Sequence, residues 1–381
     1  MEGTIKCVTA LIHSALTGEK VDFPGGLDDD YSKVIRLARG HEVAHLTAFA
    51  MLNCGLLKDE ENIKSAQKLV YDASYKDTKN RHAYELAVKA LNDAQIPFVP
   101  LKGVIIKEYY PESWMRSSCD VDILVHKKNF KRAFAMFKNM GFTLDGDLNF
   151  HDVSLIYDDS NLELHFSICE NIKNIDSVLK DVWDYTVKAE GYQYFENNDY
   201  FMFHHIAHMS YHFLAGGCGI RPFVDFWLLS KKNFFDESAV LELCKKAKIY
   251  DFYINVKHLT EVWFEGAEHS ETSKRLENYI LTGGAYGCFP NNAAAYTVRN
   301  GGKLKFLLSL AFPPYRNMKV IYPILNRVPV LLPLVYAYRI FQKTVSRNSG
   351  LAKQRYEVIR SQDKEFIKEV ASLIKALKLD K

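Results

Sequence analysis

The spacing of apolar residues changes twice along the chain. Over residues 1–95, Leu37, Val43 and Leu46 recur at roughly helical intervals, and a second helical run covers 81–94. No strand-like alternation of any length interrupts this part of the sequence. We therefore expect residues 1–95 to form a helical N-terminal region.

Short strands are predicted from residue 96 onward. Residues 96–101 are a brief apolar run, and 120–125 alternate acidic and apolar residues before becoming fully apolar. The second pattern is typical of a strand with one end in water. Two more strands are predicted at 153–157 and 162–168, joined by a polar turn at 158–161.

One helix is predicted between these strands. Phe130, Phe134 and Phe137 fall on a single helical face, and Asn129 stands where an N-terminal cap is expected. With its strands, this helix makes 96–170 a small α/β unit.

Helical spacing returns after this unit. Residues 200–214, 224–230 and 353–379 all have it. We therefore predict an α+β chain, in which an α/β core at 96–170 lies between the N-terminal helices and a C-terminal helical region, 171–381.

Acidic residues in the predicted strands carry the candidate chemistry. Asp120 and Asp122 are two positions apart, so their side chains share one face of a strand. Neighbouring carboxylates repel each other unless a cation lies between them, and oxygen ligands suit Mg²⁺. Glu163 adds a third carboxylate, and three can hold two metal ions for a phosphoryl displacement. The alternative, a solvated strand face, is disfavoured by the apolar run after Asp122 and by the second acid-bearing strand.

Other residues nearby suit a phosphate-bearing substrate. Lys102 and Arg116 can neutralise triphosphate charge, and Gly103 lets a backbone approach a phosphate closely. His165 shares a strand face with Glu163, so it is either a neighbour of the metal site or a hydrogen-bonded support.

These residues resemble a known family. The segments that carry the resemblance are Leu101-Lys102-Gly103, Tyr110-Pro111, Arg116, Asp120-Val121-Asp122-Ile123-Leu124-Val125 and Leu162-Glu163-Leu164-His165. They look like the uncharacterised bacterial nucleotidyltransferases related to the DNA polymerase beta superfamily. The resemblance is strongest over 99–168 and extends more weakly to 312–313.

The resemblance implies a small mixed sheet backed by helices, and nucleotidyl transfer from a nucleoside triphosphate with Mg²⁺ or Mn²⁺. Asp120 and Asp122 match the paired metal-binding acids of the family, and Glu163 matches the third. The wider superfamily prefers Gly-Ser or Gly-Gly in its phosphate turn, closer to the acids. Because this chain has Gly103 followed by valine and a longer gap, Lys102 and Arg116 are expected to take a larger share of the phosphate contact.

Histidines recur at helical spacing further along. His204, His208 and His212 are four residues apart, a spacing that suits zinc on a helix, but no glutamate stands between them as in an H-E-x-x-H motif. Hydrogen-bonded packing is the favoured interpretation, and contact of His208 and His212 with a substrate is the alternative. Arg221 and Asp225, also four apart, can pair across one helical turn.

Charge is distributed unevenly. The chain has 49 Lys and Arg against 46 Asp and Glu, yet residues 278–356 contain eleven Lys or Arg and no acid. Within them, 328–338 is apolar but too short and too proline-broken to span a membrane. The stretch is either a buried helical hairpin with a basic outer surface, or a surface for an anionic membrane or a polyanion.

The cysteines and the N-terminus bear on location. Seven scattered cysteines without a CxxC pair argue against a disulfide framework and against a thiolate zinc site. The N-terminus lacks a signal-peptide pattern. We expect a cytoplasmic protein, with peripheral contact to a membrane left open.

The sequence therefore predicts a Mg²⁺-dependent nucleotidyltransferase that moves a nucleoside monophosphate onto a hydroxyl or phosphate acceptor. Two alternatives remain. One is a non-catalytic nucleotide-binding or antitoxin-like interaction protein, and the other is a membrane or nucleic-acid binding module that works through 278–356.

Overall fold

Helices alone precede the first strand, as the sequence predicts. The computed structural model describes residues 2–145, 151–299, 301–345, 357, 360–361 and 363–380. The N-terminal helices are α1 (Glu2–Thr17), α2 (Tyr31–Gly40), α3 (Ala44–Asn53) and α4 (Glu60–Asp93). The long helix α4 begins where the Asp59 side chain accepts a hydrogen bond from the Asn62 amide.

A five-stranded mixed sheet follows. Its strands are β1 (Phe98–Pro100), β2 (Asp120–Val125), β3 (Thr143–Asp145), β4 (Asp152–Tyr157) and β5 (Ser160–His165). Their spatial order is β1-β2-β5-β4-β3, and only the β2–β5 pair is parallel. The predicted α+β fold with helical flanks is confirmed.

The β4–β5 hairpin fixes which side chains share a face. Asp158 and Asp159 have φ values of 45° and 64°, as a two-residue type I′ turn requires. The resulting register sets Asp152 opposite His165 and Ser154 opposite Glu163.

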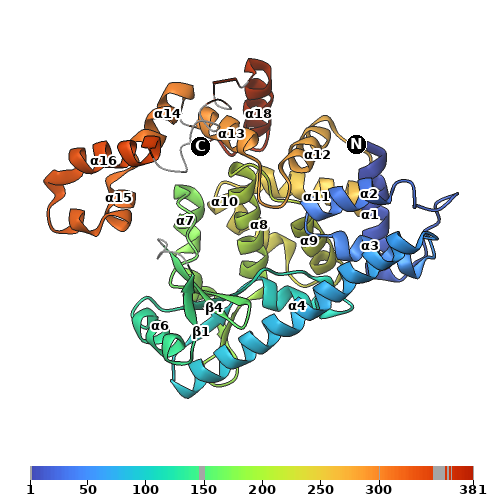
Figure 1. Cartoon of the computed structure of the whole chain (residues 1–381), viewed down its shortest axis with the longest axis horizontal. Coiled ribbons are helices and arrows are strands. Elements are labelled where there is room, and N and C mark those ends of the chain that lie inside the picture. Colours follow the sequence, from blue (N-terminus) through green and yellow to red (C-terminus); the bar gives the residue numbers. More distant parts are fainter. Residues whose placement is uncertain are drawn as a thin grey trace.

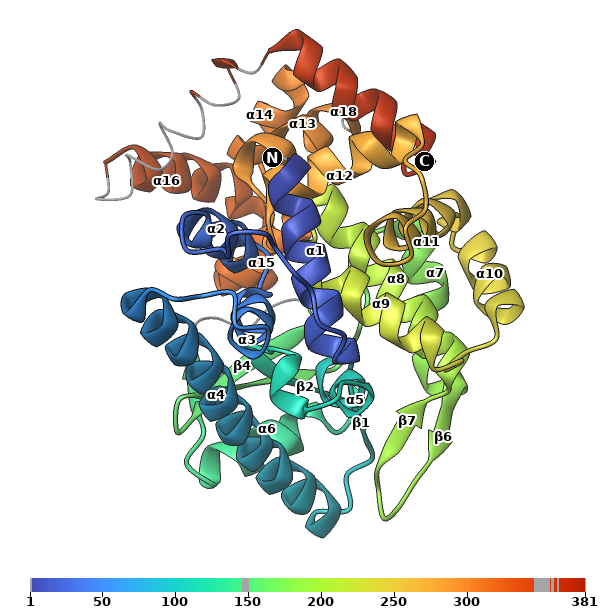
Figure 2. The same cartoon turned by 90° about the vertical axis from the view of Figure 1, so that its right-hand side faces the viewer.

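The two faces of the sheet differ in chemistry. One face is apolar and packs against α4 and against α6 (Phe130–Asn139), with Leu91 and Phe137 among the buried contacts. Figures 1 and 2 show both helices on this side. Helix α6 begins where predicted, but the Asn129 side chain makes no capping hydrogen bond. The other face carries the acidic residues and turns toward the remaining helices.

Short elements connect the sheet to the rest of the chain. Between β1 and β2 lie α5 (Gly103–Ile106), η1 (Lys107–Tyr109) and η2 (Ser113–Met115). After β5 come α7 (Lys173–Leu179), η3 (Val182–Tyr185) and a hairpin of β6 (Thr186–Lys188) and β7 (Tyr194–Glu196). This hairpin lies in the region expected to be helical. The Asn92 side chain, at the end of α4, anchors it by accepting a hydrogen bond from the Tyr192 amide.

The C-terminal half is helical. Its body contains α8 (Asn198–Leu214), α9 (Arg221–Lys231), α10 (Glu237–Lys246), α11 (Tyr250–Phe264), α12 (Glu271–Gly283), α13 (Phe289–Arg299) and α18 (Lys364–Ala376). A second group contains α14 (Lys303–Ala311), α15 (Tyr315–Ile321), η4 (Pro323–Asn326), η5 (Pro329–Leu331) and α16 (Leu332–Val345). The helix predicted over 353–379 is described from Lys364, and most of its first part lies outside the described residues.

One large hydrophobic core joins the two ends of the chain. It runs from Ile5 of α1 through Phe213 of α8 to Leu379. Figure 2 shows α1 lying beside α9 and α11, helices far from it in sequence. The N-terminal and C-terminal helices thus form one body, which faces the polar side of the sheet.

Candidate functional site

A cavity of about 320 Å³ is bounded by the polar face of the sheet and by α8 and α9. All the site residues predicted from sequence line it: Lys102, Gly103, Arg116, Asp120, Asp122, Glu163, His165, His208 and His212. We call Asp120, Asp122, Glu163 and His165, on β2 and β5, the carboxylate wall. We call His208 and His212 on α8, with Glu170, the histidine wall.

The parallel pairing of β2 and β5 builds the carboxylate wall. Asp122 is the register partner of Glu163, and Asp120 precedes Asp122 on the same face. The pKa of Asp120 is raised to about 6, first by burial and then by the negative charges of Asp122 and Glu163. Three carboxylates are therefore held closer together than their mutual repulsion favours, and a positive charge is needed among them.

His165 supplies one such charge. Its Nε2 lies 2.9 Å from Asp122 Oδ1 and 3.5 Å from Glu163 Oε2. Burial alone would lower the pKa of His165, but the bonds to these two acids raise it to about 10. The imidazolium in turn holds the pKa of Asp122 below its usual range, although burial opposes this shift.

The same three residues have the spacing of a metal site. Ligand atoms of Asp122, Glu163 and His165 lie within 4.8 Å of one another, a span that one cation can bridge. The imidazolium stands among the carboxylates where a cation would be bound. Carboxylate oxygens, joined by the imidazole nitrogen once His165 loses its proton, fit a divalent ion such as Mg²⁺ or Mn²⁺.

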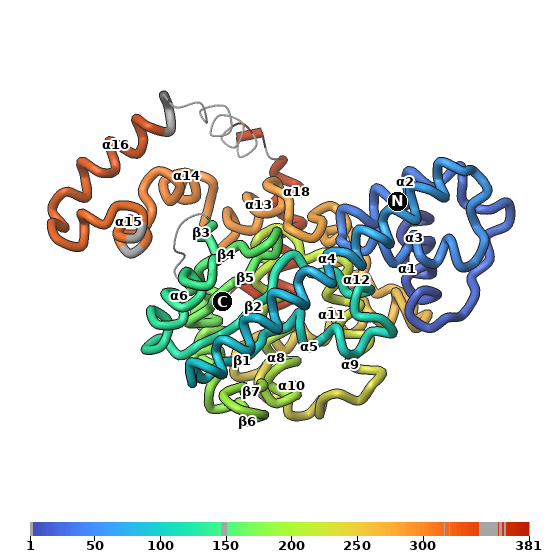
Figure 3. Tube along the Cα trace, turned by 60° about the horizontal axis from the view of Figure 1, so that its bottom comes forward, coloured from blue at the N-terminus to red at the C-terminus, as the bar shows by residue number. Residues whose placement is uncertain are grey.

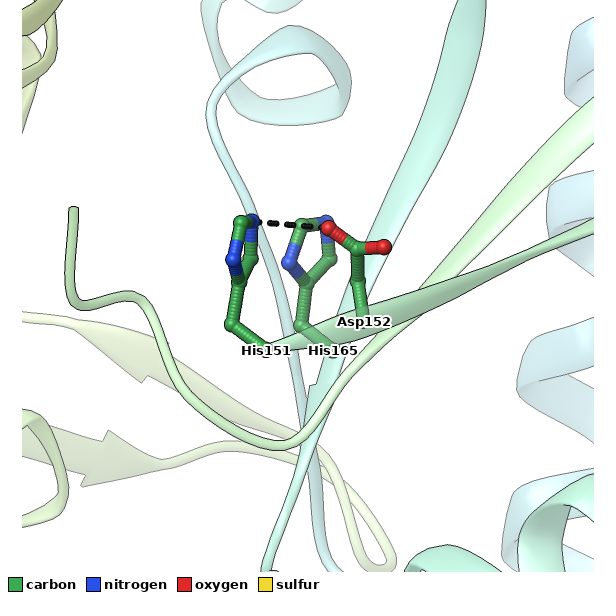
Figure 4. A group of neighbouring side chains, drawn as sticks. All are labelled: His151, Asp152 and His165. Carbon is green, nitrogen blue, oxygen red and sulfur yellow. Dashed lines mark ion pairs between the residues drawn. The ribbon is translucent and has the colours of Figure 1, made fainter. Parts of the chain in front are cut away.

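A second cluster adjoins the carboxylate wall. Figure 4 shows His151, Asp152 and His165 side by side, with His151 Nε2 2.7 Å from Asp152 Oδ2. Their ligand atoms also lie within 4.8 Å of one another. Sequence reasoning missed His151 and Asp152, because only the β4–β5 register sets Asp152 opposite His165.

Lys102 lies between the two walls. Burial lowers the pKa of its ammonium group, although Glu170 and Asp122 act in the opposite direction. Its backbone has φ 28° and ψ −84°, a conformation that non-glycine residues rarely adopt. Strain of this kind is concentrated at functional sites, and here it accompanies a buried cation that faces acids on both sides.

Arg116 is held in a buried ion pair. Its Nη2 lies 3.1 Å from Asp225 Oδ2, and Tyr110 Oη donates to the other carboxylate oxygen at 2.7 Å. A side chain at Gly103 would stand 2.8 Å from Arg116 Nη1, so this glycine makes room for the guanidinium. The pair joins the loop before β2 to α9.

The Arg221–Asp225 pair that the spacing allows is not among the ion pairs of the described residues. Arg221 Nη1 instead donates to Glu42 Oε2 at 2.9 Å, and Asp225 is occupied by Arg116. The turn of α9 directs the two side chains toward different segments. Tyr286 Oη also donates to Glu42, at 2.8 Å. Tyr286 lines the cavity and was not indicated by the sequence.

The histidine wall is a directed chain of hydrogen bonds. His208 Nδ1 lies 2.8 Å from Glu170 Oε1, and His212 Nε2 lies 2.8 Å from His208 Nε2. Because a carboxylate only accepts, His208 carries its proton on Nδ1. Its Nε2 then accepts from His212, which leaves the lone pair of His212 on Nδ1.

Burial keeps these imidazoles neutral. It lowers the pKa of His212 to about 4 and that of His208 well below its usual value, and the positive Lys102 adds to both shifts. His204 and His205 also line the cavity, and they are hydrogen-bonded to Glu196 and to the Pro222 carbonyl.

A family model described as an uncharacterised nucleotidyltransferase matches residues 28–265. The matched range contains both walls of the cavity and ends before the acid-free stretch. Comparison with curated proteins and with solved structures found no match.

Proposed function

The chain belongs to this uncharacterised nucleotidyltransferase family, and from that membership we propose that it moves a nucleoside monophosphate from a nucleoside triphosphate to a hydroxyl or phosphate acceptor. We further propose that the reaction needs Mg²⁺ or Mn²⁺ and that the family is related to the DNA polymerase beta superfamily. The observation that carries the proposal is the register of β2 and β5, with three carboxylates along one side of the cavity.

Asp120, Asp122 and Glu163 hold the metal in this proposal. The raised pKa of Asp120 supports it, because the site gains most from a cation where carboxylates repel each other. A bound divalent cation would neutralise triphosphate charge and polarise the phosphoryl group. His165 orients Asp122 and Glu163 through its Nε2.

Lys102 is the principal phosphate contact. Its ammonium group faces the cavity between the carboxylates and Glu170, where triphosphate oxygens would bring negative charge. Arg116 has a positioning role, because its charge is balanced by Asp225. Through its contact with Gly103 it shapes the turn that carries Lys102.

The histidine wall receives the acceptor. His212 Nδ1 has a lone pair, so it can accept a hydrogen bond from a polar group of the acceptor and fix its position. Glu163 takes the proton of the attacking hydroxyl as the new P–O bond forms and pyrophosphate leaves. The carboxylate wall thus serves the metal and the phosphates, and the histidine wall binds the acceptor.

A labelled phosphate group of the triphosphate shows which part of the nucleotide is transferred. The full chain is incubated with a cell extract, Mg²⁺ and a nucleoside triphosphate labelled at either the α- or the γ-phosphate. We expect stable label on an acceptor only from the α-position, lost with EDTA and in the Asp120→Asn/Asp122→Asn variant. Transfer of the γ-label would identify a kinase, and Mg²⁺-dependent binding without a product would indicate a non-catalytic protein.

A further inference from the structure

The helices after α13 form a projecting arm, residues 303–345, made of α14, α15, η4, η5 and α16. Figures 1 and 3 both show it extending away from the sheet and from the helical body. Its first helix follows α13, which itself packs against α18. The arm therefore presents much of its surface outside the hydrophobic core.

That surface is unusually apolar. Twelve of the twenty-one exposed large hydrophobic residues among the described residues lie between 304 and 341. Val330 is 78% exposed, Leu304 71% and Leu334 67%. Scattered exposed apolar residues are ordinary, but a concentration of this kind marks an interaction surface. The buried hairpin, one of the two alternatives that the sequence left open, does not describe 304–341, because twelve large apolar side chains there are exposed.

The arm is also cationic. Residues 278–356 contain no Asp or Glu, so the arm offers no internal partner for its Lys and Arg residues. Within the described part of the chain, no ion pair within 4.0 Å involves Lys305, Arg327 or Arg339. Arg339 donates instead to the carbonyls of Leu310 and Ala311. Apolar contact and positive charge therefore occur together on one projection.

We propose that the arm binds the surface of a lipid bilayer that contains anionic lipids. Exposed aliphatic side chains enter the boundary of the acyl chains, while cations contact the headgroups. The half-exposed Tyr338 suits the headgroup level, where tyrosine is enriched. None of the described helices is long and apolar enough to cross a membrane.

The charge and composition of the arm disfavour two other partners. A second copy of the chain would bring a second acid-free arm, and the like charges would repel. Single-stranded nucleic acid is bound through aromatic side chains on which bases stack, whereas Leu, Ile and Val dominate the exposed residues here. Both partners remain as outcomes that the experiment can reveal.

Vesicle co-sedimentation of the full chain tests the proposal. Neutral phosphatidylcholine vesicles are compared with vesicles that contain about 30% phosphatidylserine, at about 50 mM and about 500 mM salt. We expect binding to the anionic vesicles at low salt, release at high salt and little binding to neutral vesicles. Equal binding to both vesicle types, or none to either, would overturn the proposal.

Matched substitutions locate the surface. Val330→Ser with Leu334→Ser should reduce binding at least tenfold, whereas Val187→Ser, at a 60% exposed position on β6, should leave it unchanged. Lys305→Glu with Arg327→Glu should reduce binding by about twenty-fivefold or more, at roughly fivefold for each lost cation. If the arm substitutions instead abolish RNA binding or convert a dimer to monomers while vesicle binding persists, the proposal that the arm binds lipid is wrong.

Discussion

The two walls of the cavity differ in the charge of their side chains. On the carboxylate wall, Asp120, Asp122 and Glu163 lie side by side, and burial and repulsion raise the pKa of Asp120 to about 6. On the histidine wall, burial lowers the pKa of His212 to about 4, so the imidazole stays neutral. The carboxylate wall thus concentrates negative charge, whereas the imidazoles of the histidine wall are neutral.

In the proposed function, this difference separates the binding of metal and phosphates from the binding of the acceptor. Concentrated negative charge binds a cation and the phosphates that accompany it. In the proposed function, a chain of neutral imidazoles positions a polar acceptor by hydrogen bonding and adds no positive charge that would attract a second triphosphate. Lys102 lies between the walls, and the Arg116–Asp225 pair joins the loop before β2 to α9.

The largest effect is expected at Glu163. Glu163→Gln keeps a side-chain oxygen for the metal but loses the proton acceptor. It should therefore lower turnover by about 10²–10⁴-fold with a much smaller change in nucleotide affinity, because proton transfer acts in the transition state. Single-turnover kinetics and nucleotide titration separate the two effects, with the exposed Glu190→Gln as control. A collapse of metal–nucleotide affinity with normal single-turnover chemistry would reduce Glu163 to a binding ligand.

The buried Arg116–Asp225 pair should contribute strongly to stability. Asp225→Ala leaves the buried Arg116 guanidinium without its partner, so the free energy of unfolding should fall by about 3–5 kcal/mol. Lys231→Ala, which breaks an exposed pair with Glu265, should cost no more than about 1 kcal/mol. Denaturant titration compares them, and equal losses would contradict this contribution.

Repulsion on the carboxylate wall predicts a pH-dependent stability. The pKa of Asp120 is raised from about 3.9 in the unfolded chain to about 6, so its protonated form stabilises the fold. This contribution is present below about pH 4 and is lost as the pH rises through about 6.

Without metal, Asp120→Asn should therefore gain roughly 1–3 kcal/mol over the wild type above about pH 6.5, and little at about pH 4. Thermal unfolding at both pH values, with the exposed Asp184→Asn as control, measures the gain. A variant that is less stable at the higher pH would show that the carboxylate wall is not strained by charge.

The smallest effect is expected on the histidine wall. His212→Gln removes the Nδ1 lone pair, so transfer to the acceptor should fall by about tenfold, the value of one hydrogen bond to substrate. Binding of the metal nucleotide should stay within about twofold. The exposed His82→Gln serves as control. A loss of nucleotide binding in His212→Gln would contradict the assignment of the histidine wall to the acceptor alone.

Local periodicity is what made much of the site predictable. A period of two set Asp120 and Asp122 on one strand face, and a period of 3.6 set His208 and His212 on one helix face. Both patterns depend only on neighbours in sequence. The helical N-terminal region and the acid-bearing strands were predictable for the same reason.

Distant partners were not predictable. Arg116 and Asp225 are 109 positions apart, and Tyr286 and Glu42 are 244 apart, so no local pattern joins them. Glu170 orders the histidine wall but belongs to a loop without periodicity. The strands β6 and β7 have three residues each, too few to show alternation.

The central claim is that the carboxylate wall binds a metal nucleotide, and a thermal shift tests it most directly. The full chain and the Asp120→Asn/Asp122→Asn variant are heated with ATP, with Mg²⁺, and with both. We predict that only the wild type gains stability, only with ATP and Mg²⁺ together, and that the variant remains folded. An equal shift in the variant would contradict the assignment of the metal site to these carboxylates.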